Sequence, residues 1–316
     1  MACQVPPSLA GRSHNGLGHI LGANPMNRPI KILLQTTIPA APDDWSIARF
    51  HLLANSLRLE RDGDQRSLFN VTARDRDPPG APDSVLSGLE RSEFDQLWLF
   101  AVDTGDGLTA EDCRAISNFR RRGGGLMLTR DHMDLGCSVC GIEEVGAAHH
   151  FHSKNVDPGL PPERDDPYTT TISWPNFHSG ANGDYQLIQV EGARHAVLSN
   201  PASPAGAIRY LPSHPHEGAV SAPPGSDARV IASGTSKATG RTFNIAVAFE
   251  SVAGRGRAIA ESTFHHFADY NWNTRLGAPS FVTEPPGDAL LREPAAMADT
   301  QRYVRNIALW LGGEQP

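Results

Sequence analysis

Apolar runs and amphipathic stretches alternate along the first half of the chain. Buried parallel strands are predicted at 30–35, 67–72, 94–102 and 124–129. Between the first two, apolar residues recur at helical spacing from Ile47 to Leu59. We expect that helix to open at Asp43 and Asp44, because aspartate is a favourable N-cap.

A second helix is predicted to begin at Thr109 and to end at Gly123. Thr109 and Asp112 have the spacing of a capping box, and three arginines before Gly123 suit a helix C-terminus. A short helix over 85–89 completes the alternation. Repeated strand–helix units predict an α/β fold with a doubly wound, mostly parallel sheet.

The second half has a different pattern, rich in proline, glycine and histidine, which predicts β-rich, loop-rich insertions. Short strands are expected at 185–190, 207–211, 229–233, 243–249 and 257–262, and an amphipathic helix at 299–311. The segment 155–166 is expected to be an exposed loop. We interpret residues 1–28 as an N-terminal arm and residues 29–316 as one domain.

Composition narrows the classes of partner. The net charge is −7 with no basic block, so we expect neither nucleic acid nor an anionic membrane as a partner. No apolar run approaches the roughly 20 residues of a membrane span, and no signal peptide is evident, so a cytoplasmic protein is expected. A small-molecule substrate is the expected partner, and a homo-oligomer is compatible with the sequence.

Histidine is the compositional outlier, with 13 residues against five tyrosines and five tryptophans. Most fall in three short clusters, at 149–152, 214–217 and 265–266. A hydrophobic core does not need so many imidazoles, and this excess is the first indication of a site.

Several segments together resemble the ThuA-like (trehalose-utilisation) family of the class I glutamine amidotransferase-like superfamily. The stretch 103–109, the triple glycine at 123–125 and the segment 256–266 resemble that family's motifs, and Asp44-Trp45 is similar to its His-Asp-Trp. The resemblance covers roughly residues 30 to 312. It implies a flavodoxin-like sheet with its site at the carboxyl ends of the strands, which is also where open α/β sheets place ligands.

The turn after the fourth predicted strand is the first candidate for chemistry. Amidotransferases carry a cysteine at this elbow, whereas this chain has Asp131 and His132 there. Without a thiolate, glutamine amidotransferase activity is not expected. Asp131 and His132 are candidates for acid/base catalysis, against the alternative that Asp131 only caps a following helix.

The remaining clusters supply the other candidates. Glu217, after His214-Pro215-His216, is predicted to be catalytic, against the alternative of a plain solvent loop. Adjacent histidines on an extended segment point to opposite sides, so only one of His265 and His266 is expected to face the site. The full set of predicted metal ligands is His150, His152, His216 and His265. The predicted substrate-binding residues are Asp44, Trp45, Thr104, Arg130, His266 and Asn271.

Two further motifs favour ordinary structural roles. Cys137 and Cys140 form a single C-x-x-C without a second pair, and we interpret them as buried thiols. The triple glycine lies between a helix and a strand, the reverse order of a phosphate loop, so no nucleotide cofactor is expected.

The leading hypothesis is an enzyme, of hydrolase type, acting on a small polar substrate. The resemblance implies a carbohydrate or an oxidised sugar derivative as the substrate. The candidate residues favour hydrolysis or acid/base chemistry, and the clustered histidines suit a divalent metal such as Zn, Mn, Fe or Ni. The alternative is a non-catalytic ligand-binding or assembly module on the same fold, because a fold by itself never establishes chemistry.

Overall fold

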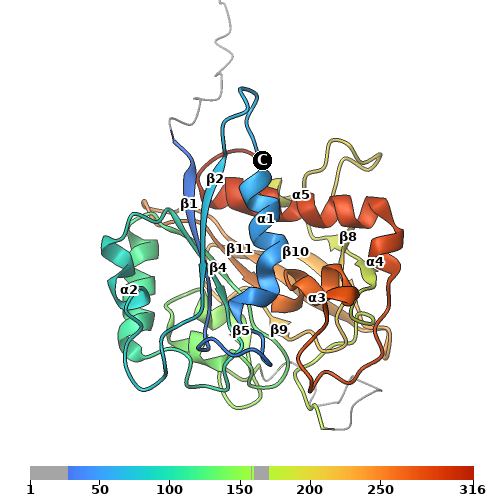
Figure 1. Ribbon diagram of the computed structural model, residues 1–316, viewed down its shortest axis with the longest axis horizontal. Coiled ribbons are helices and arrows are strands. Elements are labelled where there is room, and N and C mark those ends of the chain that lie inside the picture. Colours follow the sequence, from blue (N-terminus) through green and yellow to red (C-terminus); the bar gives the residue numbers. More distant parts are fainter. Residues whose placement is uncertain (1–27, 158, 160–170) are drawn as a thin grey trace, which may run out of the picture.

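The computed structural model describes residues 28–157, 159 and 171–316, and it is built on one large twisted sheet. Eight strands lie in the order β2-β1-β3-β4-β12-β11-β10-β7 (Figure 1). The mutually parallel strands are β1 (Ile30–Thr36), β2 (Phe69–Arg74), β3 (Gln96–Phe100), β4 (Gly125–Leu128) and β12 (Ala258–Glu261). The antiparallel strands are β11 (Thr242–Phe249), β10 (Ala228–Thr235) and β7 (Gln189–Val190). The prediction of a mostly parallel sheet is therefore confirmed.

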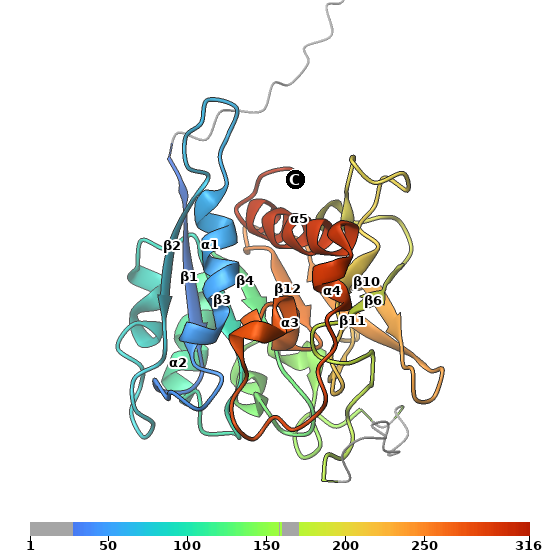
Figure 2. The ribbon, with the colours of Figure 1, turned by 45° about the vertical axis from the view of Figure 1, so that its right-hand side comes forward.

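Both faces of the sheet are covered, which explains the continuous apolar runs of its strands. Side chains alternate between the two faces along a strand. Leu34 and Trp98 pack on the face that carries α1 (His51–Leu59) and α5 (Pro294–Leu311). Leu33, Leu97 and Leu126 pack on the face that carries α2 (Ala110–Arg121). Figure 2 shows these helices on opposite sides of the sheet.

The helices follow the predicted order with two differences in their starts. The helix α1 (His51–Leu59) follows a 3-10 turn, Ile47–Phe50, and Asp43 does not open it but accepts hydrogen bonds from Ser280. The last helix, α5, begins at Pro294, earlier than predicted, because Glu293 caps it and proline suits the first turn. The helix α2 begins after Thr109, and its predicted capping box is present.

The other helical elements are short. They are α3 (Asp269–Trp272), α4 (Ala289–Arg292) and the 3-10 turns Leu86–Arg91, Cys137–Gly141, Gly146–Ala148, Ala196–Leu198, Phe264–His266 and Thr274–Leu276. Within the described part of the chain, no helix is long and apolar enough to cross a membrane.

Two small two-stranded sheets lie in the loop-rich second half. One pairs β6 (Tyr185–Leu187) with β8 (Tyr210–Pro212), and the other pairs β5 (His149–His150) with β9 (Ala219–Val220). The predicted arm lies outside the described residues apart from Arg28, as does most of the predicted loop 155–166.

The capping box of α2 predicts a measurable contribution to the stability of the protein. We expect Thr109→Ala to lower the free energy of unfolding by about 1 kcal/mol, because it leaves the backbone N–H of Asp112 without its partner. Urea denaturation would measure the change. A Thr109→Ser variant keeps the hydroxyl and should stay near the wild-type value; an equal loss in both variants would contradict the capping role.

Candidate functional site

The carboxyl ends of β4 and β12 bring two segments together that lie far apart in the sequence. Asp131 follows β4 and His265 follows β12, and the strands pair in parallel with Ala260 opposite Leu128. The backbone N–H of Phe264 donates to the carbonyl of Arg130 at 2.9 Å, which fixes the two segments side by side. This is the position where open α/β sheets carry their ligand sites.

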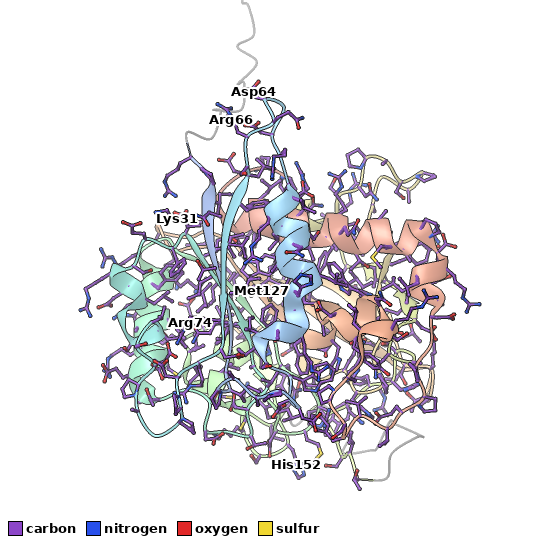
Figure 3. The ribbon with its side chains drawn as sticks, in the orientation of Figure 1. Lys31, Asp64, Arg66, Arg74, Met127 and His152 are labelled. Carbon is purple, nitrogen blue, oxygen red and sulfur yellow. The ribbon has the colours of Figure 1, made fainter. Side chains whose placement is uncertain are left out.

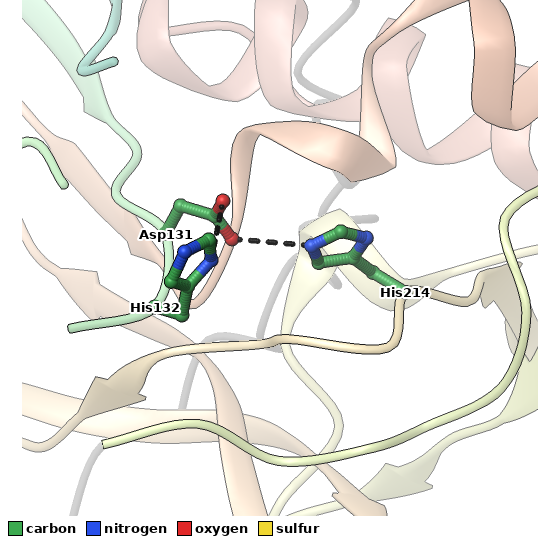
Figure 4. Close-up of side chains that lie close together, drawn as sticks. All are labelled: Asp131, His132 and His214. Carbon is green, nitrogen blue, oxygen red and sulfur yellow. Dashed lines mark ion pairs between the residues drawn. The ribbon is translucent and has the colours of Figure 1, made fainter. Parts of the chain in front are cut away.

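Asp131 is the centre of a cluster of imidazoles (Figure 4). Its Oδ2 lies 3.0 Å from Nδ1 of His132 and 3.7 Å from Nε2 of His265, and its Oδ1 lies 3.3 Å from Nε2 of His214. The carboxylate is only 2% exposed, and the hydroxyl of Thr263 donates to it at 3.3 Å. Burial alone would raise the pKa of Asp131, but the facing His132 and His214 hold it well below its usual value.

Two asparagines fix the orientation of two of these rings. Nδ1 of His265 lies 2.8 Å from Oδ1 of Asn271, and Nδ1 of His214 lies 2.9 Å from Oδ1 of Asn182. Asn271 also donates from Nδ2 to Oδ1 of Asn182 and to the carbonyl of Ser213. Because the amide oxygens must accept, each ring donates from Nδ1 and its Nε2 faces Asp131.

The imidazole rings of His214 and His265 are stacked, with centroids 3.5 Å apart and planes inclined by 12°. Burial, and next the neighbouring His265, lower the pKa of His214 well below its usual value. Trp45 closes one side of the stack with an edge contact to His265 at 4.7 Å.

His132 and His216 form the outer part of the cluster. The His216 ring makes edge contacts with His132 and His214 at 5.1 and 5.3 Å between centroids. Its Nε2 lies 3.1 Å from a carboxylate oxygen of Glu284, which lowers the pKa of Glu284. The His132 side chain is 16% exposed against 2% for Asp131, so His132 connects the cluster to solvent.

A second buried cluster lies behind the first and contains two of the predicted site residues. Oε2 of Glu217 lies 3.4 Å from Nε2 of His266, and Oε2 of Glu261 lies 3.2 Å from Nδ1 of the same ring. Gln186 and Ser262 donate to Glu217, and Tyr303 donates to Glu261. Burial works against charging the ring, but Glu217 and Glu261 raise the pKa of His266 to about 9. Glu217 and His266 are fully buried, and their side-chain partners lie within this cluster.

The structure thus places some of these residues differently from the prediction made from the sequence. His265 and His266 lie in one 3-10 turn, not on an extended segment, yet they still face different clusters. Asn271 is buried and orients His265, which differs from the substrate contact predicted for it. Asn182 was missed, because nothing in the sequence distinguishes it from the other loop asparagines.

His150 and His152 do not join the Asp131 cluster. His150 contacts the carbonyl of Asn155 and the hydroxyl of Ser221, and its Nε2 lies 3.8 Å from Asp157. His152 is exposed, at the lower edge of the molecule in Figure 3. Their i, i+2 spacing predicted a shared face, but β5 spans only His149–His150, so His152 lies outside the strand.

The predicted substrate contacts have mixed positions. Arg130 is fully buried, with its guanidinium 4.2 Å above the Phe151 ring and a hydrogen bond to the carbonyl of Met133, so it presents no surface to a substrate. Thr104 is exposed, and Asp44 accepts a hydrogen bond from the backbone N–H of Trp45. Of the predicted substrate-binding residues, Trp45 and Asn271 contact the cluster, both through His265.

Cys113, Cys137 and Cys140 lie in buried or half-buried positions. Asp131 does not cap an α-helix. A left-handed glycine, Gly136, leads into the 3-10 turn Cys137–Gly141. Burial raises the pKa of Cys113 to about 12 and that of Cys140 to about 11. Such thiols stay protonated at neutral pH and are poor nucleophiles, which agrees with their interpretation as structural residues.

A cavity of about 820 Å³ lies at the opposite end of the sheet. Four arginines line it, and each has a partner: Arg28 binds Asp95, Arg255 pairs with Glu144, and Arg122 and Arg257 donate to backbone carbonyls. The cavity is therefore an end of the sheet whose charges are already satisfied, and it contains none of the clustered histidines.

The comparisons with known proteins bear on the fold. No family model and no curated protein sequence matches the chain. A solved ThuA-like protein from Parabacteroides merdae is similar to it, with a TM-score of 0.50, 16% sequence identity and coverage of 91% of this chain and 92% of that one. A cytoplasmic protein from Salmonella typhimurium LT2 aligns with a TM-score of 0.44 at 10% identity, over 88% and 99% of the two chains. The glutaminase domain of CTPS from Trypanosoma brucei aligns with a TM-score of 0.41 at 11% identity, over 87% and 94%.

This chain has the class I glutamine amidotransferase-like fold. The sheet order and the ThuA-like neighbour agree with the flavodoxin-like architecture that the sequence predicted. At this level of identity the similarity establishes the fold, and the activity must be argued from the site itself.

The Glu217–His266–Glu261 cluster predicts a pH-dependent contribution to stability. His266→Gln should lower the free energy of unfolding by about 3 kcal/mol near pH 6, because it leaves two buried glutamates without their cation. The pKa of His266 rises from 6.5 to about 9 on folding. The contribution is therefore full below pH 6.5 and is lost as the pH rises through about 9.

Urea denaturation between pH 6 and pH 9.5 would measure this difference. Tyr303→Phe removes only one hydrogen bond from Glu261, so it should cost about 1 kcal/mol at every pH in this range. A gap between wild type and His266→Gln that stays constant with pH would contradict a charged His266.

Proposed function

We propose that this chain is an enzyme that acts on a small polar substrate through hydrolysis or acid/base chemistry at the Asp131 cluster. The observation that carries the proposal is the pair His214 and His265, each with Nδ1 held by an amide oxygen and Nε2 turned toward one carboxylate. A ring fixed at one nitrogen by a neutral acceptor keeps the other nitrogen available for chemistry.

The energetic cost of the arrangement supports a functional role. Nδ1 of His132 and Nε2 of His214 are buried and have no hydrogen bond of acceptable geometry, although both lie close to Asp131. A buried polar atom left in this way costs about 1–3 kcal/mol. Sites that retain such a cost are more often functional than structural, because a core of stable side chains would have no use for it.

His265 is the proposed proton acceptor. Its Nε2 takes a proton from a water molecule or from a carbon next to a carbonyl, and the carboxylate of Asp131, 3.7 Å away, stabilises the resulting imidazolium. In hydrolysis the oxygen of that water bonds to the substrate carbon as the bond to the leaving group breaks. The proton on His265 then passes to the leaving group.

The carbohydrate part of the proposal rests on the resemblance to the ThuA-like family. Trp45, beside His265, is an aromatic side chain of the kind on which sugar rings stack, and His132 supplies the polar contact with solvent. A carbohydrate or an oxidised sugar derivative is therefore the substrate class to test first.

The activity can be tested on a panel of aryl glycosides, sugar lactones and ketosugars. We expect His265→Gln to lower kcat/KM by about 100-fold or more on any substrate that the wild type turns over, which is the usual contribution of a general base. His51→Gln, an exposed histidine on α1, is the matched control and should retain full activity. Equal activity in the two variants would contradict the role of His265.

A different result would favour the binding module. If sugars raise the Tm of the wild type but none of the panel is turned over, the chain is a ligand-binding protein on this fold.

A further inference from the structure

We propose that Asp131, His132 and His214 bind one divalent first-row transition-metal ion, with Zn²⁺ the best match to the ligand set. This inference deepens the proposed function and rests on it for the role of the ion, which would bind and polarise the water that His265 deprotonates. The binding of the ion itself depends only on the geometry of the three side chains.

The first argument is the distance between the donor atoms. One ligand atom from each of the three side chains lies within 4.8 Å of the others. The two closest approaches are 3.0 Å from Asp131 to His132 and 3.3 Å from Asp131 to His214. Donor atoms placed tetrahedrally about 2.0 Å from one ion lie about 3.3 Å apart. The distances from the Asp131 carboxylate oxygens to the two histidines are therefore close to the spacing of ligands around a shared ion.

The tautomer of His214 is the second observation that favours a bound cation. Asn271 donates to Oδ1 of Asn182, so that atom is an acceptor, and the His214 Nδ1 bound to it carries the hydrogen. In the neutral ring, Nε2 then presents a lone pair toward a carboxylate oxygen 3.3 Å away. Two lone pairs facing each other repel, whereas a cation between them is attracted to both.

The third argument is the support around the ligands. Metal-bound histidines usually donate their second ring N–H to an oxygen acceptor, which fixes the tautomer and aims the coordinating nitrogen. The contact from His214 to Asn182 has this form. Nδ1 of His132 and Nε2 of His214 are the two proposed donor nitrogens. Both are buried without a hydrogen bond of acceptable geometry, as expected for atoms that coordinate an ion.

The chemistry of the donor atoms narrows the choice of metal ion. Two imidazoles and one carboxylate suit Zn²⁺ and its neighbours, whereas Ca²⁺ and Mg²⁺ prefer all-oxygen sites. Three protein ligands leave a fourth position open for water, which is the pattern of catalytic rather than structural zinc. His265 lies next to that centre, stacked on His214 and 3.7 Å from Asp131, and so is placed to take the proton of the bound water.

Metal binding can be measured directly on the full chain after treatment with a chelator. Titration with Zn²⁺ by calorimetry, and with Co²⁺ by visible absorption, should give one equivalent and the spectrum of a four- or five-coordinate site. His214→Gln and His132→Gln should each weaken binding by at least about 100-fold. Asn182→Ala, which removes only the support of His214, should weaken it by about 10-fold or more.

Two controls keep the test decisive. His150→Gln and His152→Gln, outside the cluster, should bind Zn²⁺ as the wild type does, and circular dichroism would verify that each variant is folded. His132 is partly exposed, so its variant serves if His214→Gln fails to fold. No binding at millimolar Zn²⁺, or one equivalent bound with unchanged affinity in the two ligand variants, would overturn the metal site.

The same material separates the two proposals. A protein that binds the ion at these residues but turns over no substrate keeps the metal site and contradicts the enzyme. A protein whose turnover is unaffected by removal of all bound metal keeps the acid/base enzyme and contradicts the proposed role of the ion in the reaction.

Discussion

The parallel pairing of β12 with β4 is the constraint on which the site depends. Ala258 lies opposite Leu126 and Ala260 opposite Leu128, so the two strands end at the same edge of the sheet. Both strands are fully buried, and the sheet on either side holds them in register. The segments that leave this edge therefore meet, and Asp131 faces His265 although the two are distant in the chain. A shift of one residue in this register would turn every side chain of β12 to the other face.

Two buried clusters of opposite character follow from this pairing. In the Glu217–His266–Glu261 cluster the two carboxylates and the imidazole ring all have partners, and the result is a buried junction between β12, α5 and the loop after β8. In the Asp131 cluster, one residue away along both segments, donor nitrogens lack hydrogen bonds of good geometry. The first cluster holds the backbone of residues 216 and 265 in place, so the second can keep side chains in an arrangement that is unfavourable by itself.

Much of the fold could be predicted from the sequence because its signals are local. The buried runs of β1, β3 and β4 and the capping box of α2 depend on residues adjacent in the chain, and their positions are confirmed. The resemblance to the ThuA-like family also gave the fold class. The start of α1 was wrong, because Asp43 finds its partner in Ser280, far along the sequence.

The site was predicted only in part, because its partners are set by long-range packing. The elbow position of Asp131 and His132 follows from the strand before them, so sequence reasoning reached it. His265 and His266 enter different clusters because of a 3-10 turn that the sequence pattern did not indicate. His214 was noticed only as part of a cluster, and Asn182 not at all, since their roles arise from a hydrogen bond that joins two loops.

Anomalous diffraction from crystals of the zinc-loaded protein would test the central claim most directly. The account predicts one strong peak at the zinc edge about 2.0–2.2 Å from a carboxylate oxygen of Asp131, Nδ1 of His132 and Nε2 of His214, with a further ligand on the open side. A peak beside His150 and His152 with none at Asp131, or no bound ion in crystals soaked at millimolar Zn²⁺, would contradict it.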